Sequence, residues 1–306
     1  MDCSWSGVSN GAAGRVDDNA PEPGVDRAFT AEGRTGADGV RERVVYDLLR
    51  EAPVADDCLG DPDETQQVAT VRPLDLAKNA IHLGRLIHNE PALLSIGQIT
   101  EHVWWMPPGP PDRPSLCAVV GERWTLALDA GASRAHTREF LDGLPQPPSA
   151  VVYTHSHWDH VFGGVEIGGL VIAHTLTAQK LVEMAARDWR DDATVGEHIR
   201  EELPAPRVVE IAQADATFDD GLVFDLGGVR VHARHVGGAH AADSSVMWVE
   251  PDGVLFLGDA LCDAVDERLE REILSFEAQR YIEGHHPSVS TRQEIEAIIA
   301  EQRDLH

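Results

Sequence analysis

The stretch VVYTHSHWDHVFGG, from Val151 to Gly164, places a short apolar run before a cluster of polar side chains and a pair of glycines. The run itself has the character of a buried strand. Four side chains that can bind a metal ion follow within six positions, namely His155, His157, Asp159 and His160. Residues two apart in an extended segment point to the same side, so His155 and His157 can present ring nitrogens to one point. After the chain turns, Asp159 and His160 can face a neighbouring point.

This loop predicts metal binding, because neutral imidazole and carboxylate groups suit Zn²⁺ and related cations. A lone histidine is usually a surface or core residue, but four such groups together are not explained in that way. The loop supplies too few ligands for two neighbouring cations, so further ligands should follow other strands. Three candidates do so: His240 in HVGGAHAADSS, Asp259 in VLFLGDAL and His285 in YIEGHHP.

With these residues in place, the chain resembles the metallo-β-lactamase superfamily, and within it most closely the glyoxalase II and lactonase-like branch. The family motif H-x-H-x-D-H matches the loop from His155 to His160 without a gap. The later family histidine, the aspartate of the G-D motif and the histidine of the G-H motif match His240, Asp259 and His285. A family aspartate at a strand end matches Asp129. The resemblance covers about residues 93–290.

The resemblance implies a set of seven ligands for two divalent cations, most often zinc, with iron or manganese as alternatives. One cation would be held by His155, His157 and His240, and the other by Asp159, His160 and His285. Asp259 would bridge the two. The catalytic residue would be Asp159, which would bind metal and orient a bridging hydroxide for attack on the substrate.

Four further residues are candidates for contacts with a ligand or for the pocket wall. His286 directly follows a candidate ligand and could handle protons. Asp243 could orient a ligand histidine through its ring N–H, or it could simply form a turn. Trp158 could wall the site or fill space under a strand end, and His174 could line the pocket or be structural.

The alternation of strands and helices after Pro91 predicts an α/β protein, and the resemblance implies the four-layer αββα sandwich over residues 93–306. Residues 1–40 are rich in Gly, Ala, Asp and Pro, and we expect them to be disordered. Residues 41–92 read as a helical extension of unknown role, with helices from Val40 and over 74–89. The charged segment from Met184 to Leu203 has helical propensity and either borders the site or forms a solvated helix.

Composition narrows the partners of the protein. The formal net charge of the 306 residues is −27, so we expect neither nucleic acid nor a membrane surface as a partner, but a small-molecule substrate. No basic segment followed by an apolar one stands at the start, and no long apolar run occurs, so we expect a soluble cytoplasmic protein. The four cysteines form no C-x-x-C pair, which is typical of reduced thiols. The oligomeric state is left open.

The function expected from the resemblance is hydrolysis of a small ester, thioester or lactone. Only 21 residues follow His285, too few for the helical substrate domain that glyoxalase II usually carries. The acidic charge disfavours the nucleases of the superfamily. Two alternatives remain: an enzyme like the mononuclear iron persulfide dioxygenases, and a non-catalytic binding protein stabilised by metal.

Overall fold

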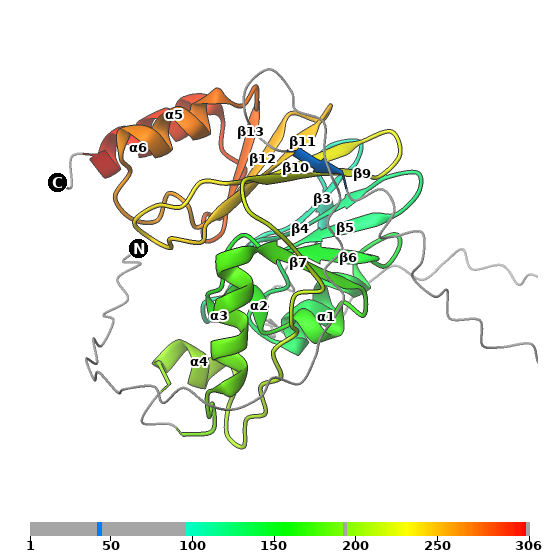
Figure 1. Cartoon of the computed structure of the whole chain (residues 1–306), viewed down its shortest axis with the longest axis vertical. Helices are drawn as coiled ribbons and strands as arrows, with labels where there is room; N and C mark the ends of the chain where they lie inside the picture. The colour runs from blue at the N-terminus through cyan, green and yellow to red at the C-terminus, as the bar shows by residue number, and fades with distance from the viewer. Residues whose placement is uncertain (1–41, 45–95, 192–194, 304–306) are drawn as a thin grey trace, which may run out of the picture. The chain divides into compact units, whose positions relative to one another are not determined.

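The computed structural model describes residues 42–44, 96–191 and 195–303, and all of them belong to one compact unit of the chain. This unit contains two β-sheets that face each other, with helices on the outer face of each sheet (Figure 1). The expected αββα sandwich is therefore confirmed. The segment expected to be disordered, residues 1–40, and the expected helix over 74–89 lie outside the described residues.

The seven-stranded sheet has the order β2-β3-β4-β5-β6-β7-β8. Its strands are β2 (Gly97–Gln98), β3 (Val103–Met106), β4 (Leu116–Val120), β5 (Thr125–Leu128), β6 (Ala150–Val152), β7 (Leu170–His174) and β8 (Ala216–Phe218). The strands from β5 to β8 run parallel to one another. Their carboxyl ends therefore lie at the same edge of the sheet.

The six-stranded sheet has the order β1-β9-β10-β11-β12-β13. Its strands are β1 (Glu42–Val44), β9 (Gly221–Asp225), β10 (Arg230–His235), β11 (Ser245–Glu250), β12 (Val254–Gly258) and β13 (Arg280–Glu283). The strands β12 and β13 are parallel, so their carboxyl ends also share one edge.

The short strand β1 differs from the sequence-based expectation of a helix from Val40 onward. Glu42–Val44 pairs in parallel with Gly221–Val223 of β9. The free edge of a sheet offers unpaired N–H and C=O groups, which can bind an extended segment regardless of its helical spacing. The helix prediction is wrong at these three residues, and the rest of that predicted helix lies outside the described part of the chain.

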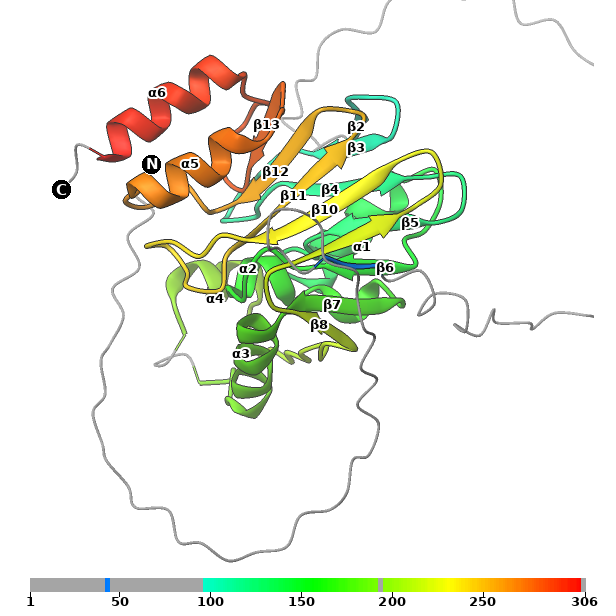
Figure 2. The same ribbon diagram turned by 45° about the horizontal axis from the view of Figure 1, so that its top comes forward.

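Helices cover both outer faces of the sandwich (Figure 2). They are α1 (Arg134–Asp142), α2 (Trp158–Val161), the 3-10 helix η2 (Gly164–Glu166), α3 (Thr175–Ala186), α4 (Glu197–Glu202), α5 (Glu267–Ser275) and α6 (Arg292–Arg303). Apolar residues of α1 to α4 pack on the seven-stranded sheet, and those of α5 and α6 pack on the six-stranded sheet. None of the described helices is long and apolar enough to cross a lipid bilayer.

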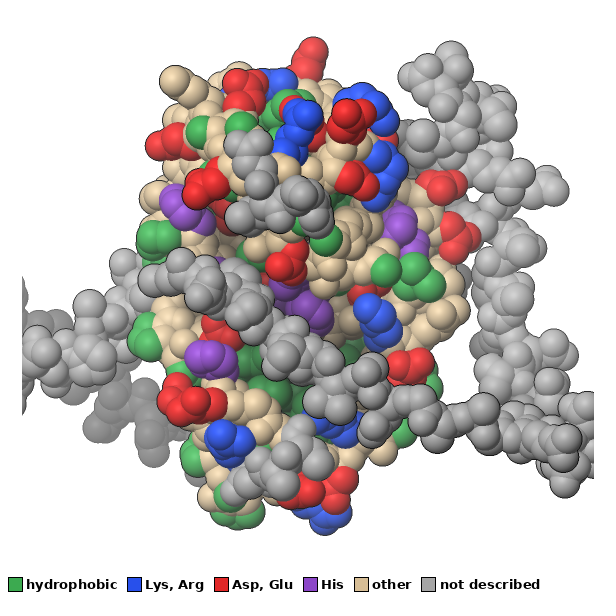
Figure 3. Space-filling model, turned by 90° about the vertical axis from the view of Figure 1, so that its left-hand side faces the viewer, with side chains coloured by type: hydrophobic (Ala, Val, Ile, Leu, Met, Phe, Trp, Pro, Cys, Tyr) green, Lys and Arg blue, Asp and Glu red, His purple; other side chains and the backbone are tan. Residues whose placement is uncertain are grey.

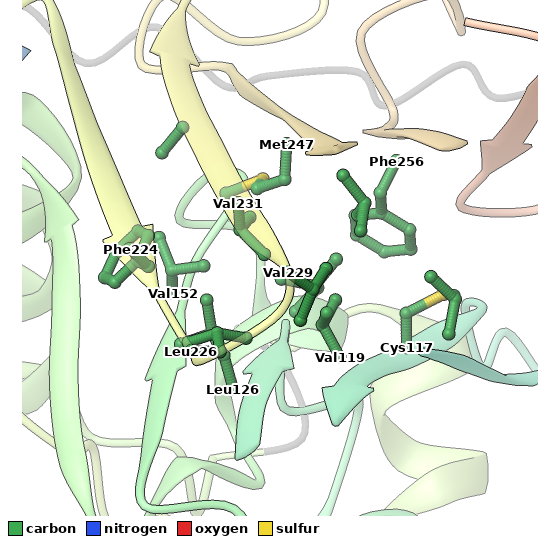
Figure 4. Close-up of a cluster of buried hydrophobic side chains, with 14 of the residues drawn as sticks. Cys117, Val119, Leu126, Val152, Phe224, Leu226, Val229, Val231, Met247 and Phe256 are labelled. Carbon is green, nitrogen blue, oxygen red and sulfur yellow. The ribbon is translucent and has the colours of Figure 1, made fainter. Parts of the chain in front are cut away.

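The central core lies between the two sheets. Leu126 and Val152 of one sheet pack in the same cluster as Phe224, Met247 and Phe256 of the other (Figure 4). Alternate residues of each strand supply this cluster, because successive side chains of a strand point to opposite faces. The core holds the two sheets together, and with them the loops that follow the strand ends.

Candidate metal centre

The candidate ligands come from loops at the carboxyl ends of strands in both sheets. His155 follows β6, and Asp259 and His285 follow the parallel pair β12 and β13. His240 lies in the loop after β10. In Figure 3, which faces the left-hand side of Figure 1, histidine and acidic side chains gather near the middle of the surface between the two helical layers. The fold thus brings together residues up to 130 positions apart, from His155 to His285.

The structure places the seven candidate ligands in two groups whose ligand atoms lie within 4.8 Å of one another. The first group is His155, His157 and His240; the second group is Asp159, His160, Asp259 and His285. Among the described residues no other three His, Cys, Asp or Glu side chains meet in this way. Cys262 is half-buried and belongs to neither group.

Within the first group, Nε2 of His240 lies 3.0 Å from Nδ1 of His157. Ligand atoms about 2.0–2.1 Å from a tetrahedral Zn²⁺ are spaced roughly 3.3 Å apart. The spacing of these two nitrogens is therefore close to that of two ligands on one cation. His155 lies close to both, with its ring centroid 4.5 Å from that of His157 and 5.2 Å from that of His240.

In the second group the spacing is also that of a shared cation. Nε2 of His285 lies 3.1 Å from Oδ2 of Asp159, and Nε2 of His160 lies 3.4 Å from the same oxygen. Asp159 and His160 sit on α2, a single helical turn that directly follows His157. The loop supplies ligands to both groups because this turn rotates Asp159 and His160 away from His155 and His157.

Asp259 lies between the two groups. Its Oδ2 is 3.3 Å from Nε2 of His160 and 3.4 Å from Nε2 of His285. The same oxygen is 3.4 Å from Nε2 of His240 and 4.0 Å from Nε2 of His155. One carboxylate oxygen can thus reach a cation in either group.

Two buried polar atoms at this place have no hydrogen-bond partner among the described residues, namely Nε2 of His155 and Oδ1 of Asp259. A buried polar atom without a partner is costly, so such atoms call for an explanation. A cation in the first group would satisfy Nε2 of His155. The donor set of imidazoles and carboxylates also suits Zn²⁺ or a similar borderline cation, so the residues fit the metal that they were predicted to bind.

Most of the candidate histidines have their second ring nitrogen occupied. Nδ1 of His160 donates to Asp129 at 2.7 Å, and Nδ1 of His240 donates to Asp263 at 3.0 Å. Nδ1 of His155 donates to the Thr154 hydroxyl at 3.0 Å. Each of these bonds leaves the Nε2 lone pair free, which is the arrangement that orients a metal-binding histidine.

Asp129 accepts the hydrogen bond from His160 and also binds Thr154, the partner of His155. It adopts φ of +62°, in the left-handed region that Asp tolerates better than most residues. Its carboxylate accepts from the backbone N–H and the hydroxyl of Thr154, at 2.6 and 2.7 Å, as well as from His160. Sequence reasoning named Asp129 as a landmark but missed the partners Asp263 and Thr154, which no spacing rule links to the ligands.

Burial keeps two histidines of the first group neutral. Burial lowers the pKa of His157 to about 4, with His240 as the next cause. Burial and the neighbouring His160 hold the pKa of His155 well below its usual range. Both imidazoles are therefore unprotonated near pH 7, which is the form that binds a metal.

The second group concentrates negative charge. Burial opposes ionisation of Asp259, but the nearby His160 outweighs it and holds the pKa of that carboxyl well below its usual range. Burial likewise disfavours a charged His285, yet its hydrogen bonds to Asp159 and Asp259 raise its pKa to about 10. These directions show that the buried carboxylates require positive charge, which a bound cation would supply.

The four additional candidates are not members of either group. Trp158 packs edge-on against Phe162, with ring centroids 5.8 Å apart, and belongs to the core under α2. His174 accepts from the backbone N–H of Leu176 and so caps α3. Nδ1 of His286 donates to the backbone oxygen of Ser288 at 2.9 Å.

Asp243 has a different set of partners from those suggested by the sequence. Instead of accepting from a ligand imidazole, its carboxylate accepts from the backbone N–H of Ser156 and from Thr177 and Lys180 of α3. The carboxylate that accepts from His240 is Asp263. The reason is tertiary packing, because α3 lies against the loop that carries Asp243.

The charged segment after α3 reaches the side of the site through α4. Glu202 of α4 accepts two hydrogen bonds from the Arg113 guanidinium, at 2.9 and 3.0 Å. The neighbouring Asp112 lies 3.6 Å from Nδ1 of His285. Burial and then Asp159 raise the pKa of Asp112, and His198 of α4 acts in the opposite direction. This part of the segment therefore borders the site, while residues 192–194 lie outside the described residues.

A buried histidine behind the site gives a testable pH dependence. Nδ1 of His136 accepts from the backbone N–H of Ala132 at 3.2 Å, and its side chain is fully buried. Burial, together with Arg113, lowers the pKa of His136 to about 3. An unfolded histidine titrates near 6.5, so the unfolded state binds more protons between these values. His136 should therefore lower the free energy of unfolding as the pH falls through this window, by about 1.4 kcal/mol per pH unit.

The variant His136→Asn should remove this part of the pH dependence. The amide oxygen of Asn can still accept from Ala132, although the smaller side chain should lower stability at every pH. Urea unfolding of the chelator-treated proteins at pH 7 and pH 5 measures the difference. If the free energy of unfolding falls by the same amount from pH 7 to pH 5 in wild type and in His136→Asn, then His136 does not become protonated on unfolding.

Comparison with known proteins gives one family match. A sequence model described as the metallo-beta-lactamase superfamily matches residues 110–297, which is more than half of the chain. The match includes all seven candidate ligands and does not separate the branches of the family. No curated protein matches.

Solved structures with the same fold include several hydrolases. The metallo-beta-lactamase from Pontibacter korlensis has 20% identity and a TM-score of 0.53, covering 69% of this chain and 99% of its own. The stereoselective inverting sec-alkylsulfatase Pisa1 from Pseudomonas sp. has 14% identity and a TM-score of 0.50, covering 69% of this chain and 41% of its own. The metallo-beta-lactamase DIM-1 has 17% identity and a TM-score of 0.50, covering 70% and 98%. At these identities the likeness concerns the fold alone.

Proposed function

The chain belongs to the metallo-β-lactamase superfamily, and from this premise we propose that it is a metal-dependent hydrolase with two divalent cations. The first group would hold one cation through His155, His157 and His240. The second group would hold the other through Asp159, His160 and His285, and Asp259 would contact both. Zinc is the metal that this mixture of imidazoles and carboxylates favours.

The observation that carries the proposal is the position of Asp259. Its Oδ2 lies 3.3 to 3.4 Å from nitrogens of both groups, those of His160, His240 and His285. A carboxylate in this position can hold two cations near each other. The complete second group favours this arrangement over the mononuclear iron alternative, which would leave several of these buried donors unused.

When bound, such a pair of cations supplies a nucleophile near neutral pH by lowering the pKa of water, and polarises the bond that is broken. The residues of the chain bind and orient. Asp159 would accept a hydrogen bond from the attacking water, since its carboxylate lies in the second group beside His160 and His285. Asp129 and Asp263 keep the ring N–H groups of His160 and His240 turned away from the reaction, so that both Nε2 atoms face it.

The proposed substrates are small esters, thioesters or lactones. In these compounds a carbonyl oxygen gains negative charge during attack, and a site that holds cations would suit a substrate of this kind. The border formed by Asp112 and the α4 residue His198 would contact the part of the substrate that projects out of the site.

A substrate screen of the zinc-loaded full chain tests the proposal. It should include an aryl ester, an acyl thioester and a lactone, and the rates should be measured before and after treatment with a chelator. We expect hydrolysis of at least one class, loss of the activity with the chelator and recovery on addition of Zn²⁺. Oxygen consumption with a persulfide by an iron-loaded protein, without any hydrolysis, would replace the proposal with the dioxygenase alternative.

A further inference from the structure

Asp243 is a buried carboxylate that contacts two other parts of the chain, the histidine loop and helix α3. Its side chain is 0% exposed. Oδ2 accepts from the backbone N–H of Ser156 and from the hydroxyl of Thr177, both at 3.0 Å, and Oδ1 accepts from Nζ of Lys180 at 2.6 Å. The carboxylate therefore joins the histidine loop, the loop after β10 and helix α3.

These contacts lie next to all three members of the first group. Ser156 stands between His155 and His157, so a bond to its N–H fixes the backbone from which both imidazoles project. Asp243 itself follows His240 by three residues. The backbone N–H of Ser245 donates to the backbone oxygen of Thr154 at 2.8 Å and adds a second link between the same two loops.

The second group is held by another carboxylate. Asp129 accepts from His160 and from Thr154, and among the described residues it accepts no hydrogen bond from the loop after β10. Asp243, in turn, accepts from no residue of the second group among the described hydrogen bonds. The two carboxylates thus act on different halves of the site, although Thr154 also contacts His155.

Lys180 gives Asp243 a charge partner. Burial opposes ionisation of this carboxyl, but Lys180 outweighs it and lowers the pKa of Asp243. The lysine side chain is 41% exposed, so its stem reaches from solvent to a carboxylate that solvent does not reach. A charged acceptor makes shorter and stronger bonds to backbone N–H groups than a neutral one does.

We infer that Asp243 is a positioning residue for the cation of the first group, acting through the backbone of the histidine loop and supported by Lys180. The inference rests on the proposed function, in which this group holds a cation. Metal ligands with fixed surroundings bind more tightly, and the loss of such outer contacts commonly lowers metal affinity 10- to 100-fold.

The test is a metal titration of the full chain without substrate. Metal-free wild type, Asp243→Ala and Asp243→Asn are titrated with Zn²⁺ against a chromophoric chelator. For Asp243→Ala we expect the affinity for one cation to fall roughly 10- to 100-fold and the other to stay within about threefold. Asp243→Asn keeps an oxygen acceptor for Ser156, so its affinity for that cation should lie between those of Asp243→Ala and wild type.

Reference variants identify the weakened cation. His240→Ala removes a ligand of the first group and His285→Ala one of the second. The absorption spectrum of Asp243→Ala carrying one Co²⁺ per chain should match that of His240→Ala with one Co²⁺. A match to His285→Ala would overturn the inference.

Asp252 offers a matched control. Its side chain is 3% exposed, and it accepts from Thr100 and from the ring and backbone of His102. It precedes β12, whereas Asp259 follows that strand seven residues later, which places it roughly 20 Å from the site. Asp252→Ala should lower the melting temperature and leave both metal affinities unchanged.

The possible results separate this inference from the function on which it rests. Two cations with wild-type affinities in Asp243→Ala, or equal weakening of both, would overturn the inference alone. If wild type binds only one cation, the two-cation proposal fails, and the inference survives only if His240→Ala abolishes that cation and Asp243→Ala weakens it.

Discussion

Asp259→Ala is expected to lower kcat for any hydrolysed substrate by roughly three orders of magnitude and to reduce the bound metal from two cations to one. The proposed bridging carboxylate lies within reach of both groups, and its loss should leave the second group with Asp159, His160 and His285. A cation contributes several kcal/mol of charge stabilisation, and about 1.4 kcal/mol corresponds to tenfold in rate. Metal content and kcat should be measured on the same preparation.

Glu283 provides the matched control for Asp259. It is a half-buried acid at the end of the neighbouring strand β13, and it accepts from the Ser290 hydroxyl at 3.1 Å rather than joining either group. Glu283→Gln should retain two cations. If Asp259→Ala keeps both cations and a rate near that of wild type, the carboxylate does not bridge a catalytic pair.

Asp159→Asn is expected to lower kcat by about 10²- to 10⁴-fold while the first group keeps its cation. The amide preserves the shape of the side chain but carries no charge, so it is a poorer acceptor for the attacking water. Asp159 lies 3.1 Å from His285 and 3.4 Å from His160, and binding in the second group should weaken as well. Kinetics at saturating Zn²⁺ separate the two effects.

The effect of Asp159→Asn should persist when the second cation is restored by excess metal, because the hydrogen bond to water is still impaired. Full recovery of kcat at high Zn²⁺ would limit Asp159 to metal binding. Asp188→Asn is a suitable control, since that exposed aspartate pairs with Arg190 and lies in neither group. It should leave both kcat and metal content unchanged.

The histidine loop was predictable because its information is local. Strand β6, which ends at Val152, and the one-turn helix that begins at Trp158 suffice to direct His155 and His157 to one point, and Asp159 and His160 to the next. The more distant candidates, His240, Asp259 and His285, were found because they follow other strands, and the resemblance to the family assigned them to the two cations. The αββα fold followed from the same match and is confirmed.

The partners of the ligands were not predictable, since they depend on how separate loops pack. Asp263 contacts His240 across 23 positions, and Lys180 contacts Asp243 across 63. Nothing in the local sequence of either residue indicates its partner. For the same reason, the sequence left open whether Asp243 orients an imidazole or forms a turn, whereas its carboxylate accepts from the backbone of Ser156.

Backbone contacts at the site are likewise invisible in the sequence. A Cβ atom at Gly284 would lie 2.0 Å from Oδ1 of Asp259, so only glycine allows the chain to pass so close to this carboxylate before His285. Strand β1 shows the same limit, because pairing with β9 decided its conformation over the helical spacing of the segment.

Elemental analysis tests the two-cation site most directly. The full chain is reconstituted with Zn²⁺, freed of excess metal by gel filtration, and analysed for zinc, iron and manganese per chain. The account predicts two zinc ions per chain in wild type and one in Asp259→Ala. A single iron per chain, or a wild-type protein that takes up no more than one cation under any loading condition, would contradict it.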